Sequence, residues 1–365
     1  MQITGVTQYD LSHALDGSFE PNWIPGYPQS THEVGLFELD TDTEHTGYAA
    51  SPSFAGGLTY DGPLSLFLTG MNPHDVDAVR RKLASVDLIG PRPWHLLMAL
   101  WDLVGKDAGK PVYELLGGSS DPISAYASAG EVGDVDDRLA WTEARVDEGF
   151  EAVKLRISSP EDVRIVEAVR ESFPDLELMV DANKGWAVRI MREEERWSPK
   201  TALSVARDLE PLDVRWFEEP LPRHDHEAYA ELRERTDVPI AGGEFLDGVG
   251  ECYDLLDAGG VDVVQPDAAI VSGIRGSLGV AAAARERGVE FVPHTWTNGL
   301  GFAANLHVMA AVDAPYCEFP MEPPWTPDAR DFLLEETFTL DDDGCVAPPD
   351  GPGLGVTVRE EVLEG

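Results

Sequence analysis

Six ionisable side chains each come at the end of a short apolar run, and they are the residues in this chain best placed to do chemistry. In the clearest run, Val214 to Pro222, the residues Val-Arg-Trp-Phe lead into two glutamates and a proline. Proline lacks the N–H needed for strand pairing, so a buried strand ends there and leaves its acidic side chains to a loop. The six positions are spaced from 23 (267 − 244) to 37 (218 − 181) residues apart. They are Asp181, Glu218, Glu244, Asp267, His294 and Glu318.

Amphipathic helical segments separate these runs, so the chain alternates between strand and helix. Such regular units predict a (β/α)8-type barrel, whose strand ends meet on one rim and hold the functional groups. The alternation begins with a strand at 123–127 and a helix at 137–148 that ends at Gly149. It is absent before about residue 122 and after about residue 320. We therefore expect an N-terminal α+β domain over 1–122, a barrel over 123–320, and a C-terminal segment, 321–365, that packs back on the N-terminal domain.

Within the N-terminal part, the patterns predict strands at 1–9 and 33–39. A helix is expected to begin at Pro73-His74-Asp75, and another to run over 93–105, where Gly105 and Gly109 interrupt it. A short helix ended by glycines should follow from Pro111.

Asp181, Glu218 and Glu244 would lie together on the rim, because they end the third, fourth and fifth strands. Three adjacent carboxylates repel one another unless a hard cation lies between them, and all-oxygen ligation suits Mg²⁺ or Mn²⁺. The alternative is that each is a solvated loop acid. Side chains alternate along a strand, so Glu219 cannot point inward with Glu218, whereas Asn183 can share the face of Asp181 and contact a ligand.

Lys154 and Arg156 are two residues apart at the end of the second strand, so both should face the barrel axis. A buried lysine beside another cation can act as a base or as a clamp for a substrate carboxylate. On the other side, Asp267 would orient His294 and raise its basicity, which makes His294 a general base. Glu318 would hydrogen-bond the substrate if protonated, or pair with a lysine or arginine.

A divalent cation flanked by a base suits the removal of a proton next to a carboxylate, because the cation stabilises the enediolate that forms. The His224-Asp225-His226 run also looks like a pair of metal ligands. It lies beyond the strand-ending proline at an expected helix start, so we interpret it as capping or surface structure.

The composition limits the partners of the protein. The chain has 67 acidic and 27 basic residues, and its net charge is −40. Only six of the basic residues are lysine. Acidic residues spread over the whole chain, rather than held in a tail, favour adaptation to high salt over an acidic surface that binds basic partners. The lack of clustered Lys and Arg argues against nucleic-acid binding. Without an apolar span or a signal peptide, a cytoplasmic protein is expected. Cys252, Cys317 and Cys345 are too widely spaced for a disulfide scaffold.

Taken together, these motifs resemble the enolase superfamily and, within it, the mandelate racemase subgroup. The resemblance covers nearly the whole chain and implies an α+β capping domain, a modified (β/α)7β TIM-type barrel, Mg²⁺, and a homo-oligomer from dimer to octamer. In the capping domain it rests on Ala99-Leu-Trp-Asp-Leu and Pro111-Val-Tyr-Glu-Leu-Leu-Gly-Gly. In the barrel it rests on Val153-Lys-Leu-Arg156, Asp181-Ala-Asn183, Trp216-Phe-Glu-Glu-Pro220, Gly243-Glu244, Pro266-Asp267-Ala, Pro293-His294 and Glu318.

One departure from the family pattern bears on the reaction. The second cation of the Lys-x-Lys pair is Arg156, and arginine stays protonated, so it is a poor base. This favours a one-base reaction, the dehydration of an aldonic or aldaric acid to a 2-keto-3-deoxy acid. The alternatives are a racemase, epimerase or cycloisomerase of a carboxylate, and a non-catalytic binding protein, which metal-dependent turnover of an aldonate would exclude.

The substrate should be selected by two N-terminal loops, Gly17 to Gln29 and Tyr48 to Gly57. Within the first, Trp23 and Tyr27 are candidates to stack on or hydrogen-bond a sugar, although they would serve equally well to pack the loop. The small-molecule carboxylate itself is not specified by any motif.

Overall fold

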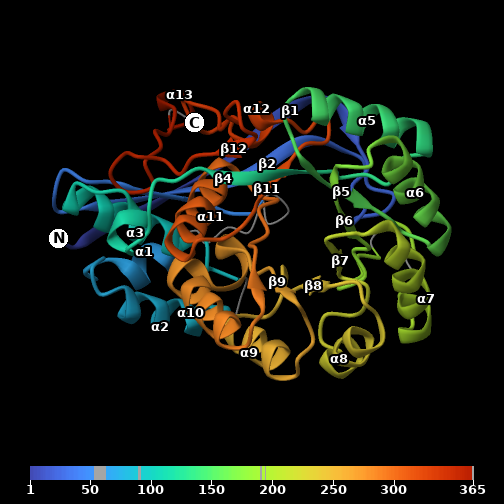
Figure 1. The fold of residues 1–365 in the computed structure, drawn as a ribbon. Coiled ribbons are helices and arrows are strands. Elements are labelled where there is room, and N and C mark those ends of the chain that lie inside the picture. The colour runs from blue at the N-terminus through green and yellow to red at the C-terminus, as the bar shows by residue number, and fades with distance from the viewer. Residues whose placement is uncertain (53–62, 89–91, 190, 194, 364–365) are drawn as a thin grey trace.

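The computed structural model describes residues 1–52, 63–88, 92–189, 191–193 and 195–363. Its N-terminal part is an antiparallel sheet in the order β1-β2-β3, packed against helices (Figure 1). The centre of β2 is buried on both faces, and this apolar stretch joins the core shared with the helices. The elements are β1 (Ile3–Phe19), β2 (Gln29–Thr41), β3 (Gly47–Ala50), α1 (Pro63–Leu68), α2 (Val76–Asp87), α3 (Leu96–Ala108) and α4 (Val112–Leu115).

Helix α3 corrects one sequence expectation. Gly105 was expected to interrupt the helix, but α3 runs through it and ends only at Gly109, which has a left-handed φ of 64°. A Cβ on Gly105 would lie 2.5 Å from Cα of Gly353, so the glycine is there to let the C-terminal segment approach. The expected start of α2 is confirmed, because the Asp75 side chain accepts a hydrogen bond from the N–H of Ala78.

Eight parallel strands follow, joined by helices that cover their outer face, in the spatial order β10-β9-β8-β7-β6-β5-β4-β11 (Figure 1). This confirms the predicted α/β barrel class. The strands are β4 (Ile123–Ser128), β5 (Ala152–Arg156), β6 (Glu177–Asp181), β7 (Trp216–Glu218), β8 (Ile240–Gly242), β9 (Val263–Val264), β10 (Glu290–Phe291) and β11 (Cys317–Pro320). The helices are α5 (Val135–Asp147), α6 (Val163–Ser172), α7 (Pro199–Leu209), α8 (His226–Arg235), α9 (Val249–Asp257), α10 (Gly273–Glu286) and α11 (Gly299–Val312).

The two edges of this curled sheet are joined beyond the strands. Thr295, just after β10, donates from its N–H to Oε2 of Glu318 in β11 at 2.8 Å, and from its hydroxyl to the Glu318 carbonyl at 2.7 Å. No β-ladder joins β10 to β11 in the described part of the chain.

Alternation along the strands divides the barrel interior into two layers. One layer is apolar and contains Tyr126, Met179 and Trp216. Two residues further along β6 and β7 the side chains are Asp181 and Glu218, because every second residue faces the same side. The strand ends therefore place polar groups directly above an apolar floor.

The C-terminal segment lies against both the N-terminal helices and the barrel. Gly353 accepts a hydrogen bond from the N–H of Val112 at 3.0 Å, and Leu354 donates to Oδ1 of Asp102 at 3.0 Å. β12 pairs antiparallel with β4, so the segment also extends the barrel sheet. The domain limits at 122 and 320 remain predictions. The elements here are α12 (Pro327–Arg330), β12 (Cys345–Val346) and α13 (Glu360–Leu363).

None of the helices that the structure describes is long and apolar enough to span a membrane.

Candidate metal and acid–base site

Asp181 and Glu218 end β6 and β7 side by side in register, and Glu244 follows β8 by two residues. All three are buried, and one oxygen of each lies within 4.8 Å of the others. Burial raises the pKa of Glu244, whose Oε2 has no hydrogen-bond partner among the described residues and lies 3.6 Å from Nε2 of His294. Buried carboxylates this close, one with an unpartnered oxygen, fit a hard divalent cation.

Lys154 is fully buried between carboxylates. Its Nζ lies 2.8 Å from Oε1 of Glu218, 2.8 Å from Oε1 of Glu318 and 3.8 Å from Oδ2 of Asp181. Burial alone would raise the pKa of Glu318, but Lys154 and His294 outweigh it and lower that pKa to about 2. Glu318 is therefore ionised, so of the two roles considered for it, the ion pair with a cation is the one present in this structure.

Arg156 is held in place on several sides. Its guanidinium pairs with Asp181, donates to the carbonyl of Ala129 at 2.7 Å and donates to Oδ1 of Asn183 at 3.2 Å. Its Cζ lies 5.4 Å from the ring centroid of Trp23, a distance at which a cation is attracted to an aromatic face. Arg156 thus links a predicted metal ligand to the loop that carries Trp23.

His294 and Asp267 form the expected dyad, with Nδ1 of His294 3.0 Å from Oδ2 of Asp267. Asn305 donates to the other oxygen of Asp267 at 2.9 Å and so fixes the carboxylate. Burial lowers the pKa of His294, but the carboxylates, Glu244 foremost, outweigh it and raise that pKa to about 9. A divalent cation on Glu244 would offset part of this attraction and leave Nε2 better able to accept a proton.

Two residues at these strand ends have left-handed backbones, Asn183 with φ 47° and Glu219 with φ 45°. Glu219 is buried and accepts a hydrogen bond from Nε1 of Trp186 at 3.1 Å, so it does not join Glu218 in the cluster of three carboxylates. Burial raises the pKa of Glu219 well above the usual range. A Cβ on Gly185 would lie 2.3 Å from Oε1 of Glu219, which explains the glycine.

The two predicted substrate loops differ in outcome. Trp23 lines a cavity at the site, together with Arg156 and His294. Tyr27 is 51% exposed and does not line that cavity, so the structure does not bring it to the site. In the second loop, 53–57 lies outside the described residues.

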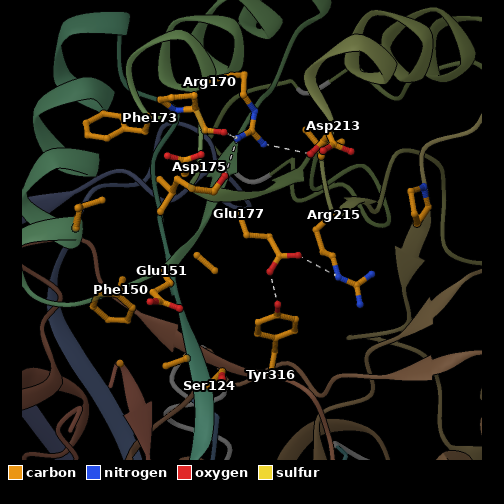
Figure 2. A pocket seen from close by; sticks show the side chains of 18 of the residues that line it. Ser124, Phe150, Glu151, Arg170, Phe173, Asp175, Glu177, Asp213, Arg215 and Tyr316 are labelled. Atoms are coloured by element: carbon orange, nitrogen blue, oxygen red, sulfur yellow. Dashed lines mark hydrogen bonds and ion pairs between the residues drawn. The ribbon is translucent and has the colours of Figure 1, made fainter. Parts of the chain in front are cut away.

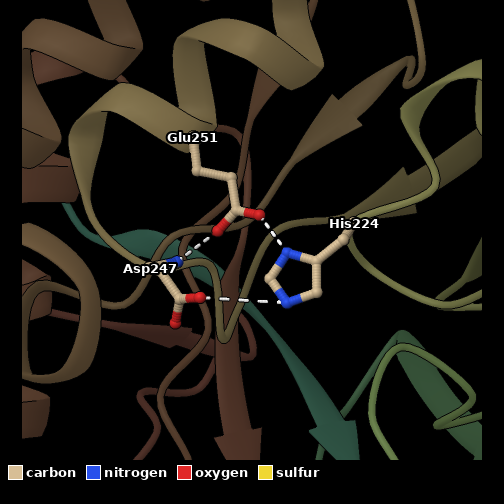
Figure 3. Close-up of side chains that lie close together, drawn as sticks. All are labelled: His224, Asp247 and Glu251. Atoms are coloured by element: carbon tan, nitrogen blue, oxygen red, sulfur yellow. Dashed lines mark hydrogen bonds and ion pairs between the residues drawn. The ribbon is translucent and has the colours of Figure 1, made fainter.

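A second group of possible ligands, His224, Asp247 and Glu251, lies where the loop before α8 meets the start of α9 (Figure 3). The His224 ring pairs with Glu251 and lies 3.8 Å from Asp247, which also pairs with Arg92 and, at 3.3 Å, with Arg223. Arginines already pair with Asp247, and the ring of His224 pairs with Glu251, so we interpret the group as a surface ion-pair network. Asp225 caps α8 through the N–H of Ala228, as the sequence indicated.

Several residues that the sequence did not single out complete the site. Gln265 and Trp216 donate to Oε2 of Glu218 at 2.9 and 3.0 Å, and Asn22 donates to Oδ1 of Asn183 at 3.0 Å. Gln265 lies two residues before Asp267, on the same face, so its position was a usable signal. The hydrogen bond from Trp216 could not be predicted from the sequence, because a tryptophan in an apolar run suggests packing alone.

The cavity at this site is small, with a volume of about 20 Å³, which is room for about one water molecule. Its lining residues are Trp23, Arg156, Asn183, Trp186, Glu244, Phe245, His294 and Trp296.

A much larger cavity, about 1220 Å³, opens at the other end of the barrel, beside the starts of β4, β5 and β6 (Figure 2). Its two arginines, Arg170 and Arg215, are partnered there. Arg215 pairs with Glu177 and Glu290, and Arg170 donates to backbone carbonyls, among them that of Leu212. The acid–base groups lie at the small cavity, so we place the candidate site there.

Comparison with known proteins agrees with this geometry. The family model for the enolase C-terminal domain-like fold matches residues 137–362, which is more than half of the chain. The chain belongs to the enolase superfamily. This confirms the superfamily that the strand-end motifs predicted, and neighbouring structures carry the name mandelate racemase.

Two curated relatives and one solved structure of this superfamily are informative. D-galactarolactone cycloisomerase from Agrobacterium fabrum is 32% identical, with 100% of this chain and 98% of the relative covered. Arabinonate dehydratase from Saccharolobus solfataricus is 35% identical, with 93% and 92% covered. The structure of L-talarate dehydratase from Polaromonas sp. JS666, complexed with Mg and L-glucarate, has a TM-score of 0.84 at 27% identity and covers 100% of this chain and 96% of that one.

Proposed function

We propose that this enolase-superfamily enzyme is a Mg²⁺-dependent dehydratase of acid sugars, aldonates or aldarates, that produces 2-keto-3-deoxy acids. The observation that carries the proposal is a buried three-carboxylate cluster beside the His294–Asp267 dyad, with Nε2 of His294 3.6 Å from Oε2 of Glu244. The similarity to arabinonate dehydratase over most of both chains supports the same reaction class.

Asp181, Glu218 and Glu244 would hold the cation. Mg²⁺ suits their oxygen ligands, and Mn²⁺ is the second candidate. When bound, the cation supplies positive charge that offsets the charge developing on the substrate carboxylate as the alpha proton leaves.

The chain's own residues would transfer the protons and keep the imidazole of the base correctly oriented. Nε2 of His294 takes the proton alpha to the carboxylate, while Asp267 on Nδ1 keeps the ring in the tautomer that can accept it. Lys154 and Arg156 add positive charge where the enediolate develops. The imidazolium at His294 then returns its proton to the departing C3 hydroxyl, which leaves as water, and the enol product tautomerises to the 2-keto acid.

A cycloisomerase is the second candidate, because the galactarolactone relative matches this chain along its whole length. Such an enzyme rearranges its substrate without losing water, so the product separates the two activities. A racemase or epimerase is disfavoured, because Arg156 is a poor base and only Lys154 would be left to serve the opposite face.

The direct test is a screen of aldonic and aldaric acids with Mg²⁺ in high salt, with detection of 2-keto-3-deoxy acids. The proposal predicts such a product from at least one acid, and loss of the product when the metal is chelated. An isomer of the supplied acid formed without loss of water, such as its C2 epimer, would instead identify one of the alternatives.

Two broader features complete the proposal. The net charge of −40 reflects adaptation to high salt, which screens repulsion between surface acids. The working form is a homo-oligomer from dimer to octamer, which sedimentation in high salt would test.

A further inference from the structure

Half of the residues that line the small cavity are aromatic. Trp23 lies against Trp296 with ring centroids 4.8 Å apart, and Trp186 stacks on Phe245 at 4.7 Å. The polar half is Arg156, Asn183, Glu244 and His294. Aromatic faces bind the apolar C–H faces of uncharged groups and attract cations, but they offer no partner to an anion.

The cationic groups of this lining are already committed. Arg156 pairs with Asp181, and His294 is bonded to Asp267. Lys154 does not line the cavity and is paired with Glu218 and Glu318. These groups can meet one substrate carboxylate, at the end where the alpha proton is removed.

Two further arginines come close, but behind the aromatic wall. The guanidinium carbons of Arg92 and Arg223 lie 5.2 and 5.9 Å from the ring centroid of Phe245, and neither residue lines the cavity. Both pair with Asp247. Arg92 also donates to the carbonyls of Phe245 and Leu246 at 3.2 and 3.1 Å. Both guanidinium groups are thus held behind the ring of Phe245 rather than in the cavity.

Arg192 and Lys184 line the neighbouring cavity, not this one, and Arg192 lies 3.5 Å from Glu20. The parts of the chain outside the described residues (53–62, 89–91, 190, 194 and 364–365) contain no lysine, arginine or histidine. A second substrate carboxylate would thus meet aromatic rings and the carboxylate of Glu244.

Given the dehydratase function proposed above, we propose that the site selects sugar monoacids, whose far end is an uncharged polyol packed on the aromatic wall, over the matching diacids. A buried carboxylate without a cationic partner costs enough to lower affinity by roughly 100-fold or more. With room for only about one water at present, the rings must also move to admit the substrate, and Trp23 is on a connecting loop between β1 and β2.

Binding tests this inference separately from turnover. The His294→Asn variant, which should not consume substrate, is titrated with galactonate and galactarate, and with gluconate and glucarate, in Mg²⁺ and high salt. The signal is tryptophan fluorescence, because Trp23, Trp186 and Trp296 line the cavity. We expect one monoacid to bind at least roughly 100-fold tighter than its diacid.

Equal or tighter binding of a diacid overturns the inference, and so does the absence of binding by all four acids. If a monoacid binds selectively but wild-type enzyme releases no 2-keto-3-deoxy product from it, the inference stands and the proposed function fails.

Two variants locate the selectivity. Phe245→Leu should weaken monoacid binding by roughly 3- to 10-fold, because a ring contact is lost without any change in charge. Arg192→Ala should leave the ratio between monoacid and diacid unchanged. If Arg192→Ala instead weakens diacid binding alone, Arg192 reaches the distal carboxylate and the inference is wrong.

Discussion

Glu244 offers the sharpest test of the metal site, because one of its oxygens is buried without a hydrogen-bond partner among the described residues. Glu244→Gln should lower turnover by at least roughly 100-fold and weaken Mg²⁺ binding, while circular dichroism shows a native fold. Calorimetric titration with Mg²⁺, beside initial rates, makes the measurement. Glu251→Gln is the matched control, since Glu251 belongs to the surface ion-pair network. Near-normal turnover of Glu244→Gln at low Mg²⁺ would show that the ligand assignment is wrong.

Residue positions at strand ends could be read from the sequence because a barrel converts order along the chain into proximity on one rim. Asp181, Glu218 and Glu244 meet as expected, and His294 meets Asp267. The reach of long side chains could not be read in the same way. The packing of whole elements decides that Trp216 donates a hydrogen bond to a carboxylate and that Tyr27 stays half exposed.

At the scale of elements, a buried ion pair fixes the loop after β4. Glu322 accepts from the N–H groups of Gly130 and Glu131 at 2.8 and 3.0 Å, and from Arg138 at 2.8 and 3.1 Å. The preceding residue, Ala129, accepts from Nε of Arg156. This loop therefore helps to hold Arg156 at the site.

Glu322→Gln should destabilise the protein by roughly 3 kcal/mol, because the charge on Arg138 stays buried without its partner. It should also lower turnover through Arg156. Asp257→Asn is the control, because its pair with Arg287 is largely exposed and is worth about 1 kcal/mol or less. Denaturant unfolding of both variants gives the comparison. Equal losses would contradict the structural role given to Glu322.

The strand–helix order could be predicted because periodicity and proline or glycine breaks are local signals. Strand lengths could not. β8 covers only Ile240–Gly242, although the apolar run is longer, because apolar residues beside a strand also serve to pack loops. Gly105 could not be interpreted from local sequence either, because a side chain there would collide with Gly353, which is far along the chain.

For the whole molecule, the charge of −40 predicts that stability depends on salt. Repulsion between surface acids extends further as the Debye length grows from about 3 Å at 1 M to about 30 Å at 0.01 M. The melting temperature should therefore rise with KCl concentration, and the fold should be lost on dialysis to low salt. A melting temperature independent of KCl would refute adaptation to salt.

Acid should also destabilise the fold through buried neutral histidines. His307 accepts from the N–H of Tyr113 at Nδ1 and donates from Nε2 to the carbonyl of Leu354, and burial lowers its pKa to about 4. Because the folded pKa lies below the unfolded value of about 6.5, this stability is complete above about pH 6.5 and is lost as the pH falls toward 4.

His307→Gln can keep both hydrogen bonds but does not titrate. Its unfolding free energy should therefore fall less steeply than that of wild type between pH 6.5 and 4, by up to roughly 3 kcal/mol over the range. Urea unfolding at several pH values measures this. Parallel curves for the two proteins would exclude His307 as a source of the acid sensitivity.

The central claim is that one base, His294, removes the alpha proton on the way to a 2-keto-3-deoxy acid. Proton NMR of a turned-over sugar acid in D₂O, with wild type, His294→Asn and Lys154→Met, tests it most directly. We predict stereospecific deuterium incorporation without the opposite C2 epimer in wild type, and no exchange in His294→Asn. Lys154→Met should mainly impair binding and charge stabilisation. Alpha-proton exchange by His294→Asn on one enantiomer would contradict the account, because Lys154 would then be a working base and a racemase or epimerase the better description.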